Sequence, residues 1–482
     1  MLPDDALFEM FDFLLGYMAN DFYSRAYEER RWIRLTHVCR RWRNVIFRSP
    51  RRLNLRLICT PKTPAEDILD IWPPLPLVIH DIYNFRDRDK PPSITSGNII
   101  AALKHKDHVC EISLECLPVK LEYIANSPAM QKPFPKLTAF RFGKFFGKLL
   151  RDNNVILPDS LLGGTAPRLR SLDLSGVAFL GLPKLLLSTT QLVDLCLYDS
   201  PPSGYIQPEV MATSLSALTS LENLRLIFRS PRLRPALESR GPHPHPLTHY
   251  TLPSLTEIQF KGTSEYLEQI LARIDAPRLI KLDIKFFNQI IFDTSQLSQF
   301  ISRIPSLRSP ETGQIEFYSD ATSVTFPPQT SDYGKLNVGV LCTTLEWQLS
   351  SLVEVCTKSL PSVCTLEDLY IHKYSYCERR WQDDDENTLW LELLHPFVVV
   401  KNLYLSKEIV LHIAPALQSL VGGRTTEVLP TLENIFLEGY QPSGHLYEGI
   451  EKFVAARSLT GHPVVVSRWD GVWEGLREIY KS

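Results

Sequence analysis

The chain has 482 residues, of which 44% are hydrophobic and 22% charged, and its formal net charge is -2. This is an ordinary globular composition without the strong positive charge that draws a protein to nucleic acid or to anionic membranes. No apolar run approaches the roughly 18 residues of a membrane span, and Asp4 and Asp5 stand where a secretory signal excludes acidic residues. We expect an intracellular protein of the cytoplasm, the nucleus or both, with no membrane partner.

Two stretches near the amino end have apolar side chains at helical spacing. The first contains Leu7, Phe8, Phe11, Leu14 and Leu15, and the second contains Trp32, Leu35, Val38, Cys39, Trp42 and Ile46. Pro3 suits a first helical turn, and Asp4 and Asp5 complement the positive end of the helix dipole. About fifty residues in short helices bury little by themselves, so this much apolar surface predicts a covering neighbour.

These residues resemble the F-box, a motif of three short helices. Leu2, Pro3, Asp5, Leu7, Phe11 and Leu14 match its first half, and residues 38–43, Val-Cys-Arg-Arg-Trp-Arg, match its second half. Residues 16–31 form a longer and more polar spacer than the family has, and its closing Leu-Trp is replaced by Ser-Pro-Arg-Arg-Leu at 49–53. The resemblance implies that residues 1–53 bind the adaptor subunit of an SCF ubiquitin ligase, with these contact or motif-core positions: Leu2, Pro3, Leu7, Phe8, Phe11, Val38 and Trp42.

The same region contains eleven arginines between Arg25 and Arg56, which raises nucleic-acid binding as an alternative. Glu28 and Glu29 interrupt the run, and the aromatic side chains belong to the apolar stripe. A solvated helix face therefore explains the arginines better, and we expect no nucleic-acid partner.

After Leu53 a pattern of the form L-x-x-L-x-L returns again and again. Nine copies are clear, at residues 137–142, 169–174, 192–197, 221–226, 255–260, 279–284, 366–371, 400–405 and 432–437. With weaker copies included, the last apolar residue of each predicted strand is Leu57, Ile79, Leu114, Phe142, Leu174, Leu197, Leu226, Phe260, Ile284, Phe317, Val340, Ile371, Leu405, Leu437 and Val466. A repeat of this length means that stacked units complete one another's core.

Several segments between these strands have helical signals. Residues 63–66 form a capping box, and Asp293 stands before a stripe that ends at Pro305. Residues 345–356 form a further stripe, and residues 406–420 form another that contains Pro415, which predicts a kink or a division.

Alternating strands and helices over residues 53–466 resemble an α/β leucine-rich-repeat solenoid with an irregular repeat. The asparagine or cysteine that usually follows the third leucine is absent, so no asparagine ladder is expected. Residues 446–460 predict a last helix, and residues 464–466 a last strand. We interpret residues 467–482, with Trp469, Trp473, Leu476 and Tyr480, as an amphipathic cap of the solenoid end; a partner-binding helix is the alternative.

No catalytic or metal site is predicted. The motifs of zinc proteases, serine hydrolases and phosphate-binding loops do not occur, and an acidic run at 382–387 lacks the glycine and distal glutamate of a calcium loop. His105, His108, Cys110 and Cys116 match no zinc spacing, and the nine cysteines include no Cys-x-x-Cys pair. We expect reduced thiols, no metal and no cofactor.

A binding surface is predicted where residues between the framework positions point away from the core. Among them Tyr370, Tyr404 and Phe436 are aromatic, and with His372 and Glu438 they form the predicted substrate-binding patch, because aromatic residues dominate interface hot spots. The alternative is that loops bury these rings.

Together the two resemblances point to the F-box/leucine-rich-repeat proteins that mushroom-forming fungi carry in many copies. They imply a non-catalytic substrate-recognition subunit of an SCF-type ubiquitin ligase, which binds the adaptor, through it a cullin, and a protein client of unknown identity. The alternatives are an interaction scaffold without ligase coupling and a nucleic-acid binder that uses the face of residues 25–56.

Overall fold

A computed structural model describes residues 3–16, 31–48, 53, 55–62, 66, 75–82, 96–144, 154–229, 248–287, 294–308, 310–328, 334–342, 345–374, 385–440 and 447–470. The chain divides into two compact units, Met1–Leu221 and Glu222–Ser482. Among the described residues, no helix is both long and apolar enough to cross a bilayer.

Among the described residues before the repeats, the first unit has the helices α1 (Asp4–Gly16), α3 (Arg31–Thr36) and α4 (Arg40–Arg48). Helix α1 packs on α4, where the rings of Phe11 and Trp42 meet edge to face with centroids 4.9 Å apart. Asp4 and Arg41 form an ion pair of 2.7 Å between the same two helices. The indole Nε1 of Trp32 donates a hydrogen bond of 3.1 Å to the carbonyl of Arg56, which ties α3 to the segment before the first strand.

The first unit then builds a parallel sheet. Its strands, in spatial order, are β1 (Leu57–Cys59), β2 (Leu77–Ile82), β3 (Val109–Cys116), β4 (Ala139–Lys144), β6 (Ser171–Ser175) and β8 (Asp194–Ser200). Framework residues line up across neighbouring strands, since Phe140 pairs in register with Leu172, which pairs with Leu195. The core of the unit is this row of buried aliphatic and aromatic side chains.

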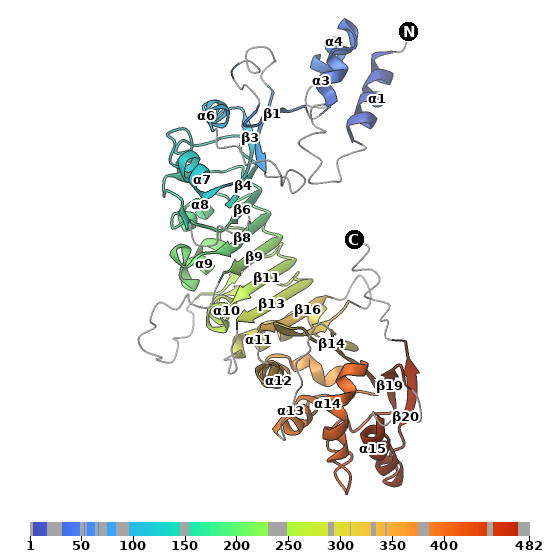
Figure 1. Ribbon diagram of the computed structural model, residues 1–482. Coiled ribbons are helices and arrows are strands. Elements are labelled where there is room, and N and C mark those ends of the chain that lie inside the picture. Colours follow the sequence, from blue (N-terminus) through green and yellow to red (C-terminus); the bar gives the residue numbers. More distant parts are fainter. Residues whose placement is uncertain are drawn as a thin grey trace. The chain divides into compact units, whose positions relative to one another are not determined.

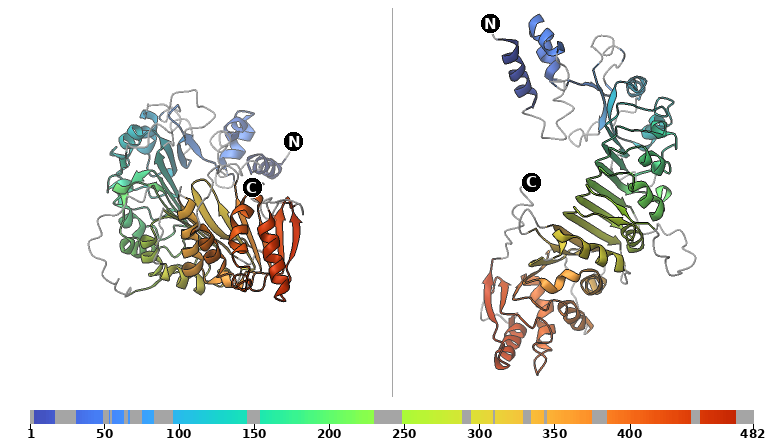
Figure 2. Two further views of the ribbon diagram at one scale, coloured as in Figure 1. Left: turned by 60° about the horizontal axis from the view of Figure 1, so that its bottom comes forward. Right: turned by 180° about the vertical axis from the view of Figure 1, so that it is seen from behind.

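Helices cover one face of these strands. They are α6 (Gly97–Leu103), α7 (Pro118–Ala125), α8 (Leu182–Leu187) and α9 (Pro208–Leu215), and they lie on the same side in each view (Figures 1 and 2). Shorter pieces complete the returns: β5 (Val155–Ile156), β7 (Val177–Ala178) and the turns Leu161–Gly164 and Pro202–Gly204. Pro118 and Pro208 each start a helix, where the missing N–H costs nothing.

In the part of the second unit that the structure describes, ten strands form one sheet. In spatial order they are β9 (Asn223–Phe228), β11 (Glu257–Gly262), β13 (Lys281–Phe287), β16 (Lys335–Leu341), β15 (Ala321–Phe326), β14 (Thr312–Phe317), β17 (Asp368–Lys373), β18 (Asn402–Leu405), β19 (Asn434–Glu438) and β20 (Val465–Trp469). A separate pair joins β10 (Tyr250–Thr251) to β12 (Ile274–Asp275). All fifteen residues predicted to end a framework strand lie in strands, so this expectation is confirmed.

The order of three strands in the second unit differs from an uninterrupted repeat. Strand β13 pairs in parallel with β16 rather than with β14, and β15 joins β16 to β14 through antiparallel pairing on both sides. Strand β14 then pairs in parallel with β17. The prediction placed residues 317 and 340 in consecutive repeats and missed β15, because a local pattern identifies a strand but not its neighbour.

The helices of the second unit are α10 (Ser264–Leu271), α11 (Ser295–Arg303), α12 (Leu345–Glu354), α13 (Asp385–Leu394), α14 (Lys407–Gln418) and α15 (Glu448–Leu459). A π-helical turn, Val355–Ser359, extends α12, and short 3-10 turns occupy Pro305–Leu307 and Pro361–Thr365. Helix α14 is continuous through Pro415, so the predicted division is wrong. The capping box at 63–66 falls mostly outside the described residues, as does Asp293.

Side chains at two helix ends show how the repeats are joined. The Glu268 carboxylate of α10 accepts backbone hydrogen bonds of 2.8 and 2.9 Å from Gln296 and Leu297 at the start of α11, where negative charge is favourable. Arg457 of α15 is 1% exposed, and its guanidinium donates to the carbonyls of residues 425, 429, 430, 432 and 462. It fixes the loop between α14 and β19.

A short amide ladder also joins three strands of the second unit. The Asn402 side chain donates to the Asp368 carboxylate at 2.7 Å, and the Asn434 side chain donates to Asn402 at 2.8 Å. These residues begin β17, β18 and β19, whereas the family ladder follows the third leucine. This ladder lies at a position that the sequence analysis did not consider, since the expected absence concerned the residues after the third leucine.

Candidate protein-interaction surface

The strands of the second unit have one buried and one open face. In β17, Leu369 and Ile371 are completely buried under the helices, while Tyr370 and His372, which alternate with them, are only half-buried. The same alternation holds in β18 and β19. We call the side without helices the strand face; it contains the aromatic residues that the sequence predicts as a binding patch.

Three predicted residues form a stacked row across this face. Tyr370 pairs in register with Tyr404, which pairs with Phe436. The Tyr370 and Tyr404 rings stack with centroids 4.1 Å apart, and the Tyr404 and Phe436 rings with centroids 4.5 Å apart. A hydrogen bond also joins the two phenol groups, and burial raises the pKa of both. We call these three rings the aromatic ladder.

Trp469 completes the ladder, although the sequence analysis placed it in an amphipathic tail. It is the last residue of β20 and pairs in register with Glu438. Its indole meets Tyr370, His372 and Tyr404 edge to face, at centroid distances of 5.9, 5.1 and 5.6 Å. The tail residues Trp473, Leu476 and Tyr480 lie outside the described residues.

His372 lies beside the ladder with one ring nitrogen unsatisfied. Its Nε2 is buried and has no hydrogen-bond partner among the described residues. Burial lowers the pKa of His372, and the carboxylates of Glu316 and Glu408 partly oppose this effect. Glu316, the register neighbour of His372 on β14, accepts hydrogen bonds of 3.0 Å from the hydroxyls of Tyr318 and Tyr374. Those two tyrosine rings stack 4.7 Å apart.

Glu438 completes the predicted patch at its edge. It is half-buried, and its carboxylate accepts a hydrogen bond of 3.1 Å from the backbone N–H of Lys407. The structure therefore brings all five predicted patch residues to the same end of the strand face. The three rings are half-buried, and their ring neighbours among the described residues include one another and Trp469.

The predicted adaptor-binding residues fall into two groups. Leu7 and Phe11 are 3% and 0% exposed, and so they pack the helices together. Phe8 and Trp42 are half-buried, Pro3 is exposed, and Leu2 lies outside the described residues. Val38 is 58% exposed. Two apolar residues that were not predicted as adaptor contacts are also exposed, Phe13 at 67% and Leu14 at 45%.

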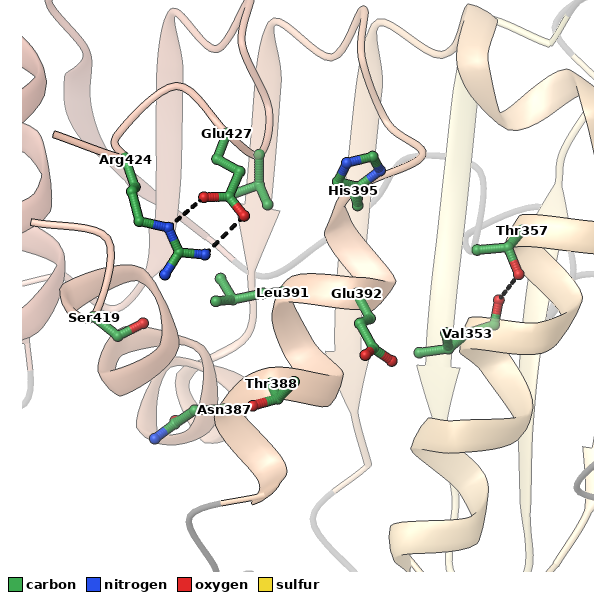
Figure 3. A pocket seen from close by; sticks show the side chains of 11 residues that line it. Val353, Thr357, Asn387, Thr388, Leu391, Glu392, His395, Ser419, Arg424 and Glu427 are labelled. Carbon is green, nitrogen blue, oxygen red and sulfur yellow. Dashed lines mark hydrogen bonds and ion pairs between the residues drawn. The ribbon is translucent and has the colours of Figure 1, made fainter.

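A depression of about 710 Å³ lies on the helical side of the second unit, between α12, its π-helical turn, α13 and the end of α14 (Figure 3). Its lining residues are Val353, Thr357, Asn387, Thr388, Leu391, Glu392, His395, Ser419, Arg424, Glu427 and Val428. The one close ion pair drawn there joins Arg424 and Glu427, through two contacts of 2.5 and 2.8 Å. The Arg424 guanidinium and the Glu427 carboxylate thus neutralise each other. None of the lining residues was predicted as a site from the sequence.

The residues missed on the strand face are Trp469 and the Glu316, Tyr318 and Tyr374 group. Strand alternation supplies a signal for Trp469, since it lies two residues after Ser467 and four after Val465 on β20. For Glu316 no sequence signal exists, because its position beside His372 depends on the reversed order of β14, β15 and β16.

No protein-family model matches the sequence, and no curated protein matches it either. Among solved structures, the leucine-rich repeat-containing protein LegL7 from Legionella pneumophila is similar, with 13% sequence identity, 85% of this chain and 99% of that chain covered, and a TM-score of 0.27. A likeness this weak supports no argument about function. The observed parallel sheet with helices on one face is consistent with a leucine-rich-repeat-like α/β fold.

Proposed function

We propose that this chain is the non-catalytic substrate-recognition subunit of an intracellular SCF-type ubiquitin ligase. In this proposal residues 1–53 bind the adaptor, and through it a cullin, while the strand face of the second unit binds a protein client. Holding the client near the ubiquitin-charged enzyme replaces a bimolecular encounter by an intramolecular one, which is a large source of rate enhancement.

The observation that carries the proposal is the meeting of the two halves of the F-box-like motif. The halves are separated by a long spacer, yet Phe11 packs on Trp42 and Asp4 pairs with Arg41. This packing leaves Phe13 and Leu14 exposed on α1, and Val38 exposed in the turn between α3 and α4. Exposed apolar side chains on such a small unit are the expected contacts of a protein partner.

The client-binding half of the proposal is supported by the aromatic ladder. Protein interfaces gain most of their binding energy from a few aromatic and arginine side chains in well-packed surroundings. Tyr370, Tyr404 and Phe436 are held in one arrangement by mutual stacking, so little side-chain entropy is lost when a partner covers them.

The adaptor half is tested by substituting exposed residues, because replacing buried Leu7 would disturb the helices themselves. We expect Leu14→Asp with Val38→Asp to abolish co-precipitation of a purified SCF adaptor. Val119→Asp on α7 is a matched control, since Val119 is 74% exposed and lies outside the motif. Undiminished adaptor binding by the double variant would reject ligase coupling and leave a scaffold role.

A further inference from the structure

The strand face of the second unit has opposite charge at its two ends. On β9, β11, β13 and β16 the open-face residues include five cations, Arg225, Lys261, Lys281, Lys285 and Lys335, and two carboxylates, Glu257 and Asp283. Five positive charges less two negative charges leave +3 on these four strands. We call this part of the strand face the basic end.

The open-face charges of the neighbouring strands are negative. On β14, β17, β18 and β19 the open-face residues include Glu316, Asp368 and Glu438 but no lysine or arginine, which gives -3. The open-face residues of β15 are Ala321, Ser323 and Thr325, all uncharged. This second part, which contains the aromatic ladder, we call the acidic aromatic end.

The cations at the basic end outnumber the carboxylates beside them. Lys261 is the register neighbour of Lys285, and Lys281 that of Lys335, and like charges opposite each other on a sheet are destabilising. Glu257 lies between two cations, at 3.1 Å from Lys281 and 3.6 Å from Arg225. Such a cluster favours an anionic group that bridges it.

The carboxylates of the acidic aromatic end have neutral hydrogen-bond donors. Glu316 accepts from tyrosine hydroxyls, Asp368 from the Asn402 amide and Glu438 from a backbone N–H. Lys401, which directly precedes β18, forms an ion pair with Glu367 at 3.0 Å. Carboxylates beside tyrosine and tryptophan rings suit a guanidinium or ammonium group, which gains from both ion pairing and cation–π contact.

We propose that the strand face of the second unit binds one client segment with segregated charge, acidic residues against the basic end and arginine or lysine against the acidic aromatic end. From β13 to β17 there are four strand steps, or about 19 Å at ~4.8 Å per step. An extended segment covers that distance in about six residues.

The proposal deepens the client-binding half of the proposed function and does not depend on adaptor binding. Nucleic acid fits less well, because a uniform polyanion meets repulsion at the acidic aromatic end.

The test is selection of a random 16-residue peptide display library on the purified full chain. We expect the enriched peptides to contain an acidic cluster and an arginine or lysine about six residues apart, in one fixed order. The variant Lys261→Glu, Lys285→Glu, Lys335→Glu should lose the acidic preference, keep the cationic one, and bind an enriched peptide at least tenfold more weakly in fluorescence anisotropy.

The matched control is Arg278→Glu, Arg303→Glu, Lys452→Glu, which makes the same change of net charge outside the strands. It should select the same peptides as the native chain. Absence of enriched peptides, or an unchanged pattern in the strand-face variant, would overturn the proposal. The proposal would also be overturned if no peptide is enriched and a fluorescent single-stranded RNA binds the native chain but not the strand-face variant. Because adaptor co-precipitation is measured separately on the same variants, failure here is distinguishable from failure of ligase coupling.

Discussion

The helices before the repeats and the helices of the last repeats have similar amphipathic sequences, but their apolar side chains differ in burial. In the last repeats, Trp390 and Phe397 are completely buried, as is Phe453 on α15. In α1 and the turn after α3, Phe13 and Val38 are more than half exposed. A hydrophobic stripe therefore identifies the face of a helix that needs covering, but it does not say whether the same chain supplies the cover.

The two regions also differ in how they are anchored. The last repeats are joined by a buried arginine, an amide ladder and stacked rings, each of which connects several strands or loops. Among the described residues, the contacts of the first helices include two aromatic pairs, one exposed ion pair, and side-chain hydrogen bonds from Trp32 and Arg43 to backbone carbonyls. We expect substitutions in the last repeats to lower the stability of the second unit, and substitutions in the first helices to act locally.

The largest effect is expected at Arg457. In Arg457→Met the carbonyls of Thr425, Pro430 and Leu432 lose the guanidinium donor, and each unsatisfied group costs about 1–3 kcal/mol. The Leu429 carbonyl still accepts a hydrogen bond from the N–H of Leu432. The free energy of unfolding of the second unit should fall by at least about 4 kcal/mol, measured by urea denaturation. Lys452→Met on the same helix should change it by less than about 0.5 kcal/mol, because Lys452 is exposed. Equal losses in both variants would contradict this role for Arg457.

The next effect compares one core residue from each region. Leu403→Ala in β18 leaves a cavity in a fully buried row, and we expect a loss of about 3 kcal/mol in the second unit. Phe11→Ala removes a larger buried ring, yet only the helices within Asp4–Arg48 depend on it. Hydrogen exchange should therefore show lost amide protection in those helices alone. Loss of protection in β3 and β4 as well would show that the first helices share the core of the repeats.

The sequence pattern predicts which residues form strands and which of them are buried, but not which strands or chains pack against them. Strands such as β18 are predictable, because Leu403 and Leu405 belong to a row that every repeat must fill with an apolar residue. The spatial order β16, β15, β14 is not predictable from the sequence, since several strand pairings satisfy the same alternation of buried and open residues. The ladder of Tyr370, Tyr404 and Phe436 could be predicted from strand alternation, whereas the contact of Trp469 depends on where β20 pairs.

A smaller effect is expected at the centre of the aromatic ladder. Tyr404→Ala removes ring contacts with Tyr370, Phe436 and Trp469. It also removes an acceptor for the Tyr370 hydroxyl, and should lower the unfolding free energy of the second unit by about 2 kcal/mol. Tyr404→Phe keeps the rings stacked and should lower it by about 1 kcal/mol. Client-peptide binding should fall in the alanine variant and persist in the phenylalanine variant. A loss of equal size in both would assign the binding to the hydroxyl rather than to the ring.

The smallest effect concerns the pH dependence of the second unit. Burial against Tyr370 and Trp469 lowers the pKa of His372 below its ordinary value of 6.5, although the carboxylates of Glu316 and Glu408 oppose this. As the pH falls through 6.5, the unfolded chain takes up a proton that the folded chain does not, so stability decreases toward acidic pH. In His372→Asn this contribution is absent, and the urea midpoint should change less between pH 7.5 and pH 5.5. His80→Asn is the comparison in the first unit, where burial also lowers the pKa of His80. A midpoint in His372→Asn with the native pH dependence would show that the ring is protonated equally in the folded and unfolded chain.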